Sequence, residues 1–520
     1  MRVQKTLVRH GVTLRHGRFQ IRERVMVCCG GCRSKSGRLV AVRPASLADH
    51  LLPRGVFGYD VMAFVGTQRF LESRQRDEIV EALQKEHGIT ISTGEVSLLC
   101  RRFLEYLEAL HLARSPQIRA ALAADGGWPA HVDTTCEDGQ GTLLVILAGW
   151  REWVLTAARI PTENKDAILP NLKVTAERYG MPCAAMRDLG PAVIQALNLF
   201  REQAGEKFPI LGCQFHFLAD VGKDLMKRHH NLLRDGVRRH KLLGELRALA
   251  RQLGRRLGND VAEAREELLA WQQAADQGHR IPEGKAGLAV LRSLAQWTLD
   301  YRADGAREGF PFDQPYLDFY DRCHTCLRAT EAFLRSPHQD VAPRRYLEKL
   351  QAILQPVAED KAMAVAAGHL RERVRLFQRM RLALRLRKNP RDTSPERKDS
   401  VIDADQRSKE IRDVRSGVAR FLRQLRKERP QRGPAKERRQ AIDLILEHFR
   451  RHRRSLWGHE IHLPPELGGG IRLVARTNNN LEGCFHGIKH AERRRSGRKK
   501  LAHDMETLPA AVALSRNLNK

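Results

Sequence analysis

Apolar residues recur every three or four positions from about residue 76 to 110 and from about residue 216 to 470, which predicts helices in both stretches. The pattern changes at Trp128, where short apolar, β-rich runs follow one another: HVDTT, GTLLVILAGW and EWVLTAARI. The first two are separated by DGQG and the last two by Trp150-Arg151, both compact turns of the kind that join antiparallel strands. This part of the chain is therefore expected to begin with three antiparallel strands.

The next segments alternate between helix and strand. A helical stretch, NKDAILPNLKVTAERYG, is interrupted by Pro170, and CAAMRDLG then predicts a short strand that ends at an acid. The helix PAVIQALNLFREQ and the strand FPILGCQF follow. Three antiparallel strands, a helix, a parallel strand, a helix and a further strand are the order of an α/β RNase H-like core with a mixed sheet. We expect its first part to span residues 126–216.

The N-terminal part is expected to contain two regions. Residues 1–58 are basic, rich in glycine turns, and carry Cys28, Cys29 and Cys32, a candidate partial zinc module that His10 or His16 would complete. Residues 59–125 have a helix, a break at His87-Gly88 and a second helix, with Ser92 and Glu95 spaced as a capping box. This second region predicts either a helix-turn-helix that enters a major groove or an ordinary helical hairpin.

A long basic segment, residues 217–470, keeps the helical pattern of apolar positions throughout. We expect it to be one all-helical domain inserted into the core. Residues 471–520 would then return to the core with a C-terminal helix and a basic tail.

Charge points to a polyanionic partner. The 520 residues include 91 Lys and Arg against 61 Asp and Glu, a formal charge of +30, and the isoelectric point is 10.3. Nucleic acid is the favoured partner, although basic ribosomal or membrane-surface proteins share such a charge. No apolar run reaches the ~20 residues of a membrane span, so a cytoplasmic location is expected. Ten dispersed cysteines indicate reduced thiols.

Three acids carry the candidate chemistry: Asp133 in HVDTT, Asp188 in MRDLG and Glu482 in TNNNLEG. The first two lie on or directly after predicted strands of one sheet, and Glu482 lies near the start of a basic helix. Carboxylates brought together in this way hold hard divalent cations, and two Mg²⁺ or Mn²⁺ ions support in-line displacement at a phosphodiester. We therefore assign Asp133, Asp188 and Glu482 as catalytic and metal-binding residues.

HVDTT, MRDLG and TNNNLEGCFHGIKHAERRRSGR together resemble the three signatures of DDE-type transposases of bacterial insertion sequences. The resemblance covers most of the chain, from about Tyr59 onward, and its last motif is the most specific. It implies an RNase H-like core, a divalent-metal cofactor and double-stranded DNA, at transposon ends and target, as partner. It also implies DNA contacts by residues of the last motif: Asn479, Lys489, Arg493, Arg494, Arg495 and Arg498.

Two further features fit that resemblance. Related transposases of the hAT and Mutator-like type insert a helical domain before the third acid and carry a Cys-x-x-His motif after the second one. Here the motif is Cys213 to His216, supporting residues that would orient the scissile phosphate or stabilise the core; a buried cysteine with a satisfied core histidine is the alternative. By analogy, synapsis of two DNA ends implies at least a homodimer, in the bacterial cytoplasm at the nucleoid.

Three functions are compatible with these motifs. The leading one is a transposase that cuts transposon ends and transfers strands by two-metal catalysis. An RNase H-like nuclease or resolvase would cut without joining, and a non-catalytic regulator derived from a transposase would bind DNA only.

Overall fold

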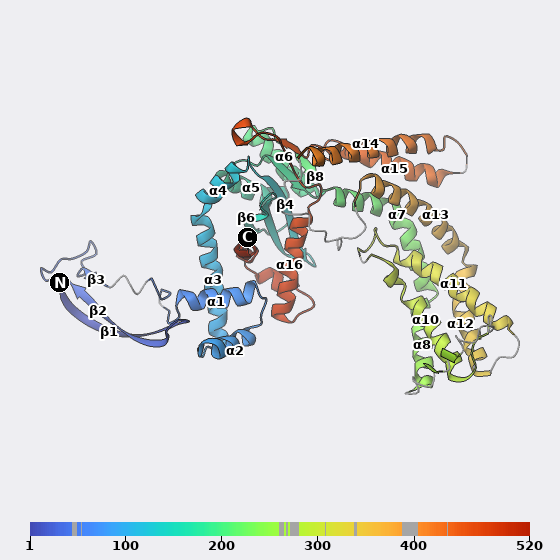
Figure 1. The fold of residues 1–520 in the computed structure, drawn as a ribbon, viewed down its shortest axis with the longest axis horizontal. Helices are drawn as coiled ribbons and strands as arrows, with labels where there is room; N and C mark the ends of the chain where they lie inside the picture. The colour runs from blue at the N-terminus through green and yellow to red at the C-terminus, as the bar shows by residue number, and fades with distance from the viewer. Residues whose placement is uncertain are drawn as a thin grey trace. The chain divides into compact units, whose positions relative to one another are not determined.

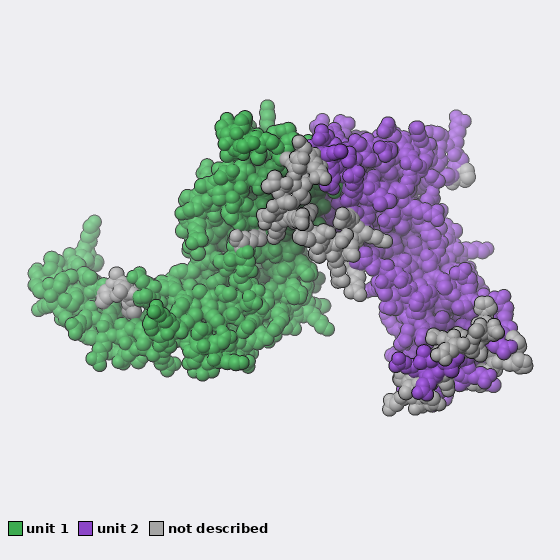
Figure 2. Space-filling view, viewed as in Figure 1, with its two compact units in different colours: residues 1–213, 458–520 green, residues 214–457 purple. Residues whose placement is uncertain are grey.

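The computed structural model describes residues 1–43, 49–53, 55–258, 265–266, 269–270, 280–306, 308–336, 341–386, 404–433 and 435–519. The chain divides into two compact units (Figure 2). Unit 1 comprises Met1–Cys213 and Gly458–Lys520, and unit 2 comprises Gln214–Trp457. The all-helical insertion was predicted over residues 217–470, so unit 2 begins three residues earlier and residues 458–470 belong to unit 1.

Unit 1 is built on a five-stranded mixed sheet in the order β6-β5-β4-β7-β8 (Figure 1). The first three strands are antiparallel, whereas β7 and β8 run parallel to β4. The prediction of an α/β chain with a mixed sheet is confirmed. The strands are β4 (Pro129–Glu137), β5 (Gln140–Ala148), β6 (Trp153–Arg159), β7 (Ala184–Arg187) and β8 (Ile210–Gly212).

Both faces of this sheet are covered, as alternate residues of β5 demonstrate. Leu143, Val145 and Leu147 belong to one apolar cluster, which includes residues of α3 (Thr93–Ala113), α16 (Asn479–Ser496) and the C-terminal segment. Leu144 and Ile146 belong to the other, which includes residues of α5 (Lys165–Tyr179) and α6 (Pro191–Ala204). Because side chains alternate between faces along a strand, a continuous apolar run such as TLLVILA marks a strand buried on both sides.

The helices of unit 1 come before, between and after the strands of this sheet in the sequence, and α5, α6 and α16 lie beside the sheet (Figure 1). The Ser92–Glu95 capping box predicted for α3 is present. Pro170 does not interrupt α5 as predicted, because its missing N–H costs one backbone bond while Ile168 and Leu172 pack into the core. The helices are α1 (Tyr59–Phe70), α2 (Arg76–His87), α3 (Thr93–Ala113), α4 (Ser115–Ala124), α5 (Lys165–Tyr179), α6 (Pro191–Ala204), α16 (Asn479–Ser496), α17 (Ala502–Thr507), and the 3-10 segments η2 (Pro465–Leu467) and η3 (Ala510–Asn519).

Two smaller sheets complete unit 1. Near the N-terminus, where sequence analysis identified only basic charge and cysteines, β1 (Arg2–Thr13) and β2 (Gly17–Val27) pair antiparallel along their length. The short strand β3 (Ala41–Val42) adds to the end of β2. Before α16, β9 (Glu460–His462) pairs with β10 (Ile471–Leu473).

Unit 2 is helical over its described residues, in agreement with the periodicity of its sequence. Its elements are α7 (Gln214–Arg239), α8 (Leu242–Leu257), α10 (Gly284–Leu299), η1 (Tyr301–Asp304), α11 (Pro315–Arg335), α12 (Val341–Glu359), α13 (Lys361–Ala383), α14 (Ala404–Glu428) and α15 (Lys436–His452). Among the described residues of the whole chain, no helix has both the length and the apolarity that a membrane crossing requires.

Candidate active site

Parallel pairing of β4 with β7 brings Asp133 and Asp188 side by side. The register pairs Ala130 with Ala185 and Val132 with Arg187. Asp133 is the next residue of β4 and Asp188 directly follows β7, so the two acids occupy the same level where adjacent strands are roughly 4.8 Å apart. The sequence predicted both acids at strand ends; Asp188 does follow the end of β7, whereas Asp133 lies in the middle of β4, which continues to Glu137.

Asp133 is an acid in an unfavourable environment for its charge. Its side chain is buried, and the Thr134 N–H donates a hydrogen bond of 2.8 Å to its Oδ1. Burial raises the pKa of Asp133 well above its usual range, and the nearby charges of Asp188, Glu482 and Glu163 raise it further. A carboxyl group with such a pKa favours either a proton or a cation beside it.

Glu163 is a fourth carboxylate that the sequence analysis did not identify. It lies in the turn before α5, and its Oε2 accepts a hydrogen bond of 2.8 Å from the Thr134 hydroxyl. Its Oε1 also approaches Gly190, where an added Cβ would lie 3.2 Å from Glu163 and 3.0 Å from Oδ2 of Asp188. Glu163 thus borders both predicted acids, through the residue that follows Asp133 and through Gly190.

Asp188 is held at the start of helix α6. Its Oδ1 accepts a hydrogen bond of 3.1 Å from the Gly190 N–H, and Gly190 is the residue that precedes the helix. This contact fixes the carboxylate beside the positive end of the α6 dipole. The absence of a side chain at Gly190 leaves room for the oxygens of both Asp188 and Glu163.

Glu482 reaches the sheet because the beginning of α16 is anchored in the core. Asn478, the residue before the helix, is fully buried; its Oδ1 accepts a 2.8 Å hydrogen bond from His131 Nδ1, and its N–H donates to Cys213 Sγ at 3.2 Å. The Asn478 side chain does not cap the helix and bonds to β4 instead. Glu482 follows in the first turn.

Further along α16, basic residues bind the end of β4. Lys489 Nζ donates to the carbonyl oxygen of Cys136 at 2.5 Å and lies 3.3 Å from Glu137. Arg493 forms an ion pair with the same carboxylate at 3.0 Å. Helix α16 therefore lies along β4, the packing that a catalytic role for Glu482 requires.

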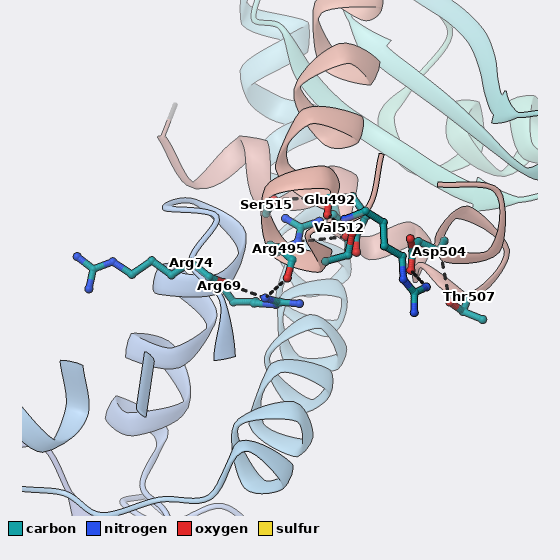
Figure 3. A network of polar contacts seen from close by, with 10 residues as sticks. Arg69, Arg74, Glu492, Arg495, Asp504, Thr507, Val512 and Ser515 are labelled. Atoms are coloured by element: carbon teal, nitrogen blue, oxygen red, sulfur yellow. Dashed lines mark hydrogen bonds and ion pairs between the residues drawn. The ribbon is translucent and has the colours of Figure 1, made fainter. Parts of the chain in front are cut away.

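The remaining basic residues of this motif differ in exposure. Arg495 is buried against Glu492 at 2.6 Å, with its guanidinium over the ring of Phe70, in the polar network of Figure 3. This side chain is part of the interior, so it is not available to the DNA contact predicted for it. Arg494 pairs with Glu78 and Arg498 with Asp504 at the surface, and Asn479 is exposed at the start of α16.

Cys213 lies at the end of β8 and is fully buried. Its sulfur lies within 4.8 Å of a carboxylate oxygen of Glu482. His216, predicted as its partner in supporting the site, lies in the first turn of α7, where unit 2 begins. The predicted Cys-x-x-His motif thus spans the junction from a core strand to a helix.

Two other groups of potential metal ligands are the N-terminal cysteines and a group in unit 2. The sulfurs of Cys28 and Cys32 lie 3.1 Å apart, and a hydrogen bond between them lowers the pKa of Cys28; Cys29 is exposed. Among the described residues, neither group of three potential ligands includes these cysteines. One such group is in unit 2, made of His229, His369 and Glu437.

That group in unit 2 is better described as an ion-pair cluster. The Glu437 carboxylate already binds Arg373 at 2.7 Å and lies 3.6 Å from Arg228. Burial lowers the pKa of His229, and the charge of Arg373 lowers it further. The guanidinium groups of Arg373 and Arg228 thus already neutralise the Glu437 carboxylate, which a metal ion would need as a ligand.

Comparison with protein-family models and with curated proteins gave no match for this chain. Function is therefore inferred from the carboxylates around β4, their packing and the charge of the chain.

Proposed function

We propose that the protein is a DDE-type transposase whose unit 1 carries a divalent-metal site for phosphodiester cleavage and strand transfer. The observation that carries the proposal is the convergence of four carboxylates: Asp133 and Asp188 at one level of the sheet, Glu482 on the anchored α16, and Glu163 in the turn between β6 and α5. Their charges act together on Asp133. The strand order β6-β5-β4-β7-β8 supports an RNase H-like core.

The donor set suits Mg²⁺ or Mn²⁺. Hard cations bind carboxylate oxygens, and Mg²⁺ commonly uses few protein ligands together with water and substrate phosphates. The raised pKa of Asp133 is further support, because uncompensated negative charge is what a bound cation would neutralise. Asp133, Asp188 and Glu482 would hold the metal. When bound, two such ions polarise the phosphate and activate the attacking oxygen.

The surrounding residues hold these carboxylates in position. Thr134 donates hydrogen bonds to Asp133 through its N–H and to Glu163 through its hydroxyl, so this one residue orients both carboxylates. Gly190 orients Asp188, and Asn478 fixes the first turn of α16. Lys489 and Arg493 keep Glu137 paired outside the group of acids and supply positive charge for a DNA backbone near it.

The test is cleavage of a supercoiled plasmid that carries the DNA flanking the gene, in Mg²⁺ or Mn²⁺. Asp133→Asn should lower the cleavage rate by at least about a hundredfold and leave DNA affinity unchanged or higher. Asp138→Asn is the matched control, because Asp138 is exposed in the turn after β4 and tolerates Asn at its positive φ. Equal cleavage by Asp133→Asn and wild type would refute the proposal.

Two alternatives differ in what they yield. A nuclease on the same fold would cleave the plasmid but give no joined product from precut ends in a strand-transfer assay. A DNA-binding regulator would bind the same duplex and leave it intact in either metal.

A further inference from the structure

The N-terminal strands β1 and β2 form a ribbon that is two-stranded over most of its length. Their antiparallel pairing extends from Thr13–Gly17 at the turn to Arg2–Val27, whereas β3 pairs only with Met26 and Val27. Between the turn and Arg24, no third strand runs beside the ribbon in the described part of the chain; its one further backbone pairing there is the isolated bridge of Val12 with Phe57. The major groove of DNA, about 12 Å wide, admits such a ribbon.

The two faces of this ribbon differ in chemistry. Directly opposed residues of an antiparallel pair share a face, and the register opposes Thr6 to Arg24, Val8 to Arg22 and His10 to Gln20. With Arg18 they form one face, called here the basic face, whose exposed residues are Thr6, Val8, His10, Arg18, Gln20, Arg22 and Arg24. Val12, which opposes Arg18 on this face near the turn, is buried.

The opposite face is occupied by the protein itself. Glu23 and Val25 are buried there, and Phe19 and Ile21 are half-buried. Glu23 pairs with Arg9 at 3.0 Å and lies 3.9 Å from Arg43. The ion pairs of this sheet therefore lie on the inner face, while in the described structure none of Arg18, Arg22 and Arg24 has an acidic partner.

From these observations we infer that the basic face of the β1–β2 ribbon is a binding surface for double-stranded DNA. Residues 1–43 contain eleven Lys and Arg and a single acid, Glu23, which is already paired. Arg18 and Arg24 are six residues apart on one strand, so the three arginines span about 20 Å, the length of roughly six base pairs. A row of arginines at this scale matches the phosphates beside a groove, with Gln20 and His10 between them able to reach base edges.

This inference extends the proposed function by naming the element that holds DNA, and it rests on that function for its choice of duplex DNA. It concerns affinity, whereas the carboxylates concern cleavage. The two can therefore be separated by experiment in the full-length protein.

The experiment measures the affinity of the triple variant Arg18→Gln, Arg22→Gln, Arg24→Gln for a fluorescent DNA duplex as salt is varied. We expect the affinity of the triple variant at physiological salt to fall by roughly tenfold or more. The slope of log affinity against log salt concentration should decrease in magnitude by about two to three, because three phosphate contacts are lost. The triple Arg→Lys variant should recover most of the affinity, since lysine keeps the phosphate contact as a point charge. That recovery also shows that the loss comes from charge and not from misfolding.

The matched control removes the same charge from scattered exposed positions, as Lys85→Gln, Lys173→Gln, Lys207→Gln. Equal loss in this control, or loss of RNA binding without loss of duplex DNA binding, would overturn the inference. Cleavage at saturating DNA should persist in the ribbon variant. If only the ribbon variant loses affinity but neither wild type nor variant cleaves DNA, the ribbon inference stands and the proposed chemistry fails. If wild type cleaves DNA but the ribbon variant keeps its full affinity, the proposed chemistry stands and the ribbon inference fails.

Discussion

Asn478 and His131 share a buried hydrogen bond of 2.8 Å that joins the beginning of α16 to the central strand β4. Asn478 is fully buried and His131 nearly so. Burial lowers the pKa of His131 to about 4, so its ring is neutral near pH 7 and Nδ1 donates to the Asn478 oxygen. This bond links residues that are far apart in sequence and orients the helix turn that carries Glu482.

Removing the partner of His131 should weaken both the fold and the site. Asn478→Ala leaves Nδ1 of a buried imidazole without an acceptor, which costs about 1–3 kcal/mol of unfolding free energy, and it frees Glu482 to shift, which lowers the cleavage rate. Urea unfolding and plasmid cleavage measure the two effects. The neighbouring Asn479→Ala, at an exposed position, should leave the free energy of unfolding unchanged; equal losses of stability in both variants would mean that the bond has no special role.

Glu163 offers a test of the fourth carboxylate. Glu163→Gln keeps the size and the hydrogen bond from Thr134 but removes a charge that faces Asp133 and Asp188. We expect the metal concentration for half-maximal cleavage to rise by about tenfold, with activity recovering at high metal. Glu177→Gln, an exposed residue of α5, is the control. Unchanged metal dependence in Glu163→Gln would exclude Glu163 from the metal site.

Asp133 should make stability depend on pH and on metal. Because its pKa is raised in the fold, the folded chain holds this proton more tightly than the unfolded chain. The contribution of Asp133 to stability is therefore fully present below the ordinary carboxyl pKa of about 4. It is lost progressively as pH rises from that value through the raised pKa of the folded chain. Mg²⁺ should offset the loss.

The measurement is thermal unfolding across pH, with and without Mg²⁺. Asp133→Asn should be more stable than wild type at neutral pH without metal, and should gain less from Mg²⁺. If Asp133→Asn were less stable than wild type under these conditions and gained as much stability from Mg²⁺, the ionised Asp133 carboxylate would not destabilise the metal-free fold.

Arg495 and Arg498 belong to one basic motif but should respond differently to mutation. Arg495→Ala removes one partner of a buried pair with Glu492 and should cost about 3–5 kcal/mol of unfolding free energy. Arg498→Ala removes an exposed ion pair with Asp504, worth at most about 1 kcal/mol. Chemical denaturation compares the two, and equal costs would contradict the burial difference.

The sequence predicted what depends on local pattern. Short apolar, β-rich runs predicted β4, β5 and β6. A short strand followed by an acid and Gly190-Pro191 predicted both β7 and the position of Asp188 before a helix. The Ser92–Glu95 spacing predicted the start of α3. Each of these features is determined by residues within a few positions of one another, so one segment contains the whole signal.

What was missed depends on contacts between distant segments. Glu163 lies in a polar turn, and only its bond to Thr134 on another strand distinguishes it from other exposed acids. Arg495 resembles its basic neighbours in sequence, yet the helix rotates it toward Phe70. The β1–β2 ribbon did leave a local signal, the alternation of Arg22, Arg24 and apolar residues in FQIRERVMV, which the high charge obscured.

The insertion of unit 2 between Cys213 and Gly458 also determines when the group of acids is completed during synthesis. Asp133, Glu163 and Asp188 are translated first, and Glu482 follows only after residues 214–457. At about 5–20 residues per second, a ribosome needs roughly 15 to 60 s to reach Glu482 after Asp188. After Gly212, a nascent chain therefore carries all five strands of the mixed sheet without its last carboxylate, and the complete group of acids exists only near the end of translation.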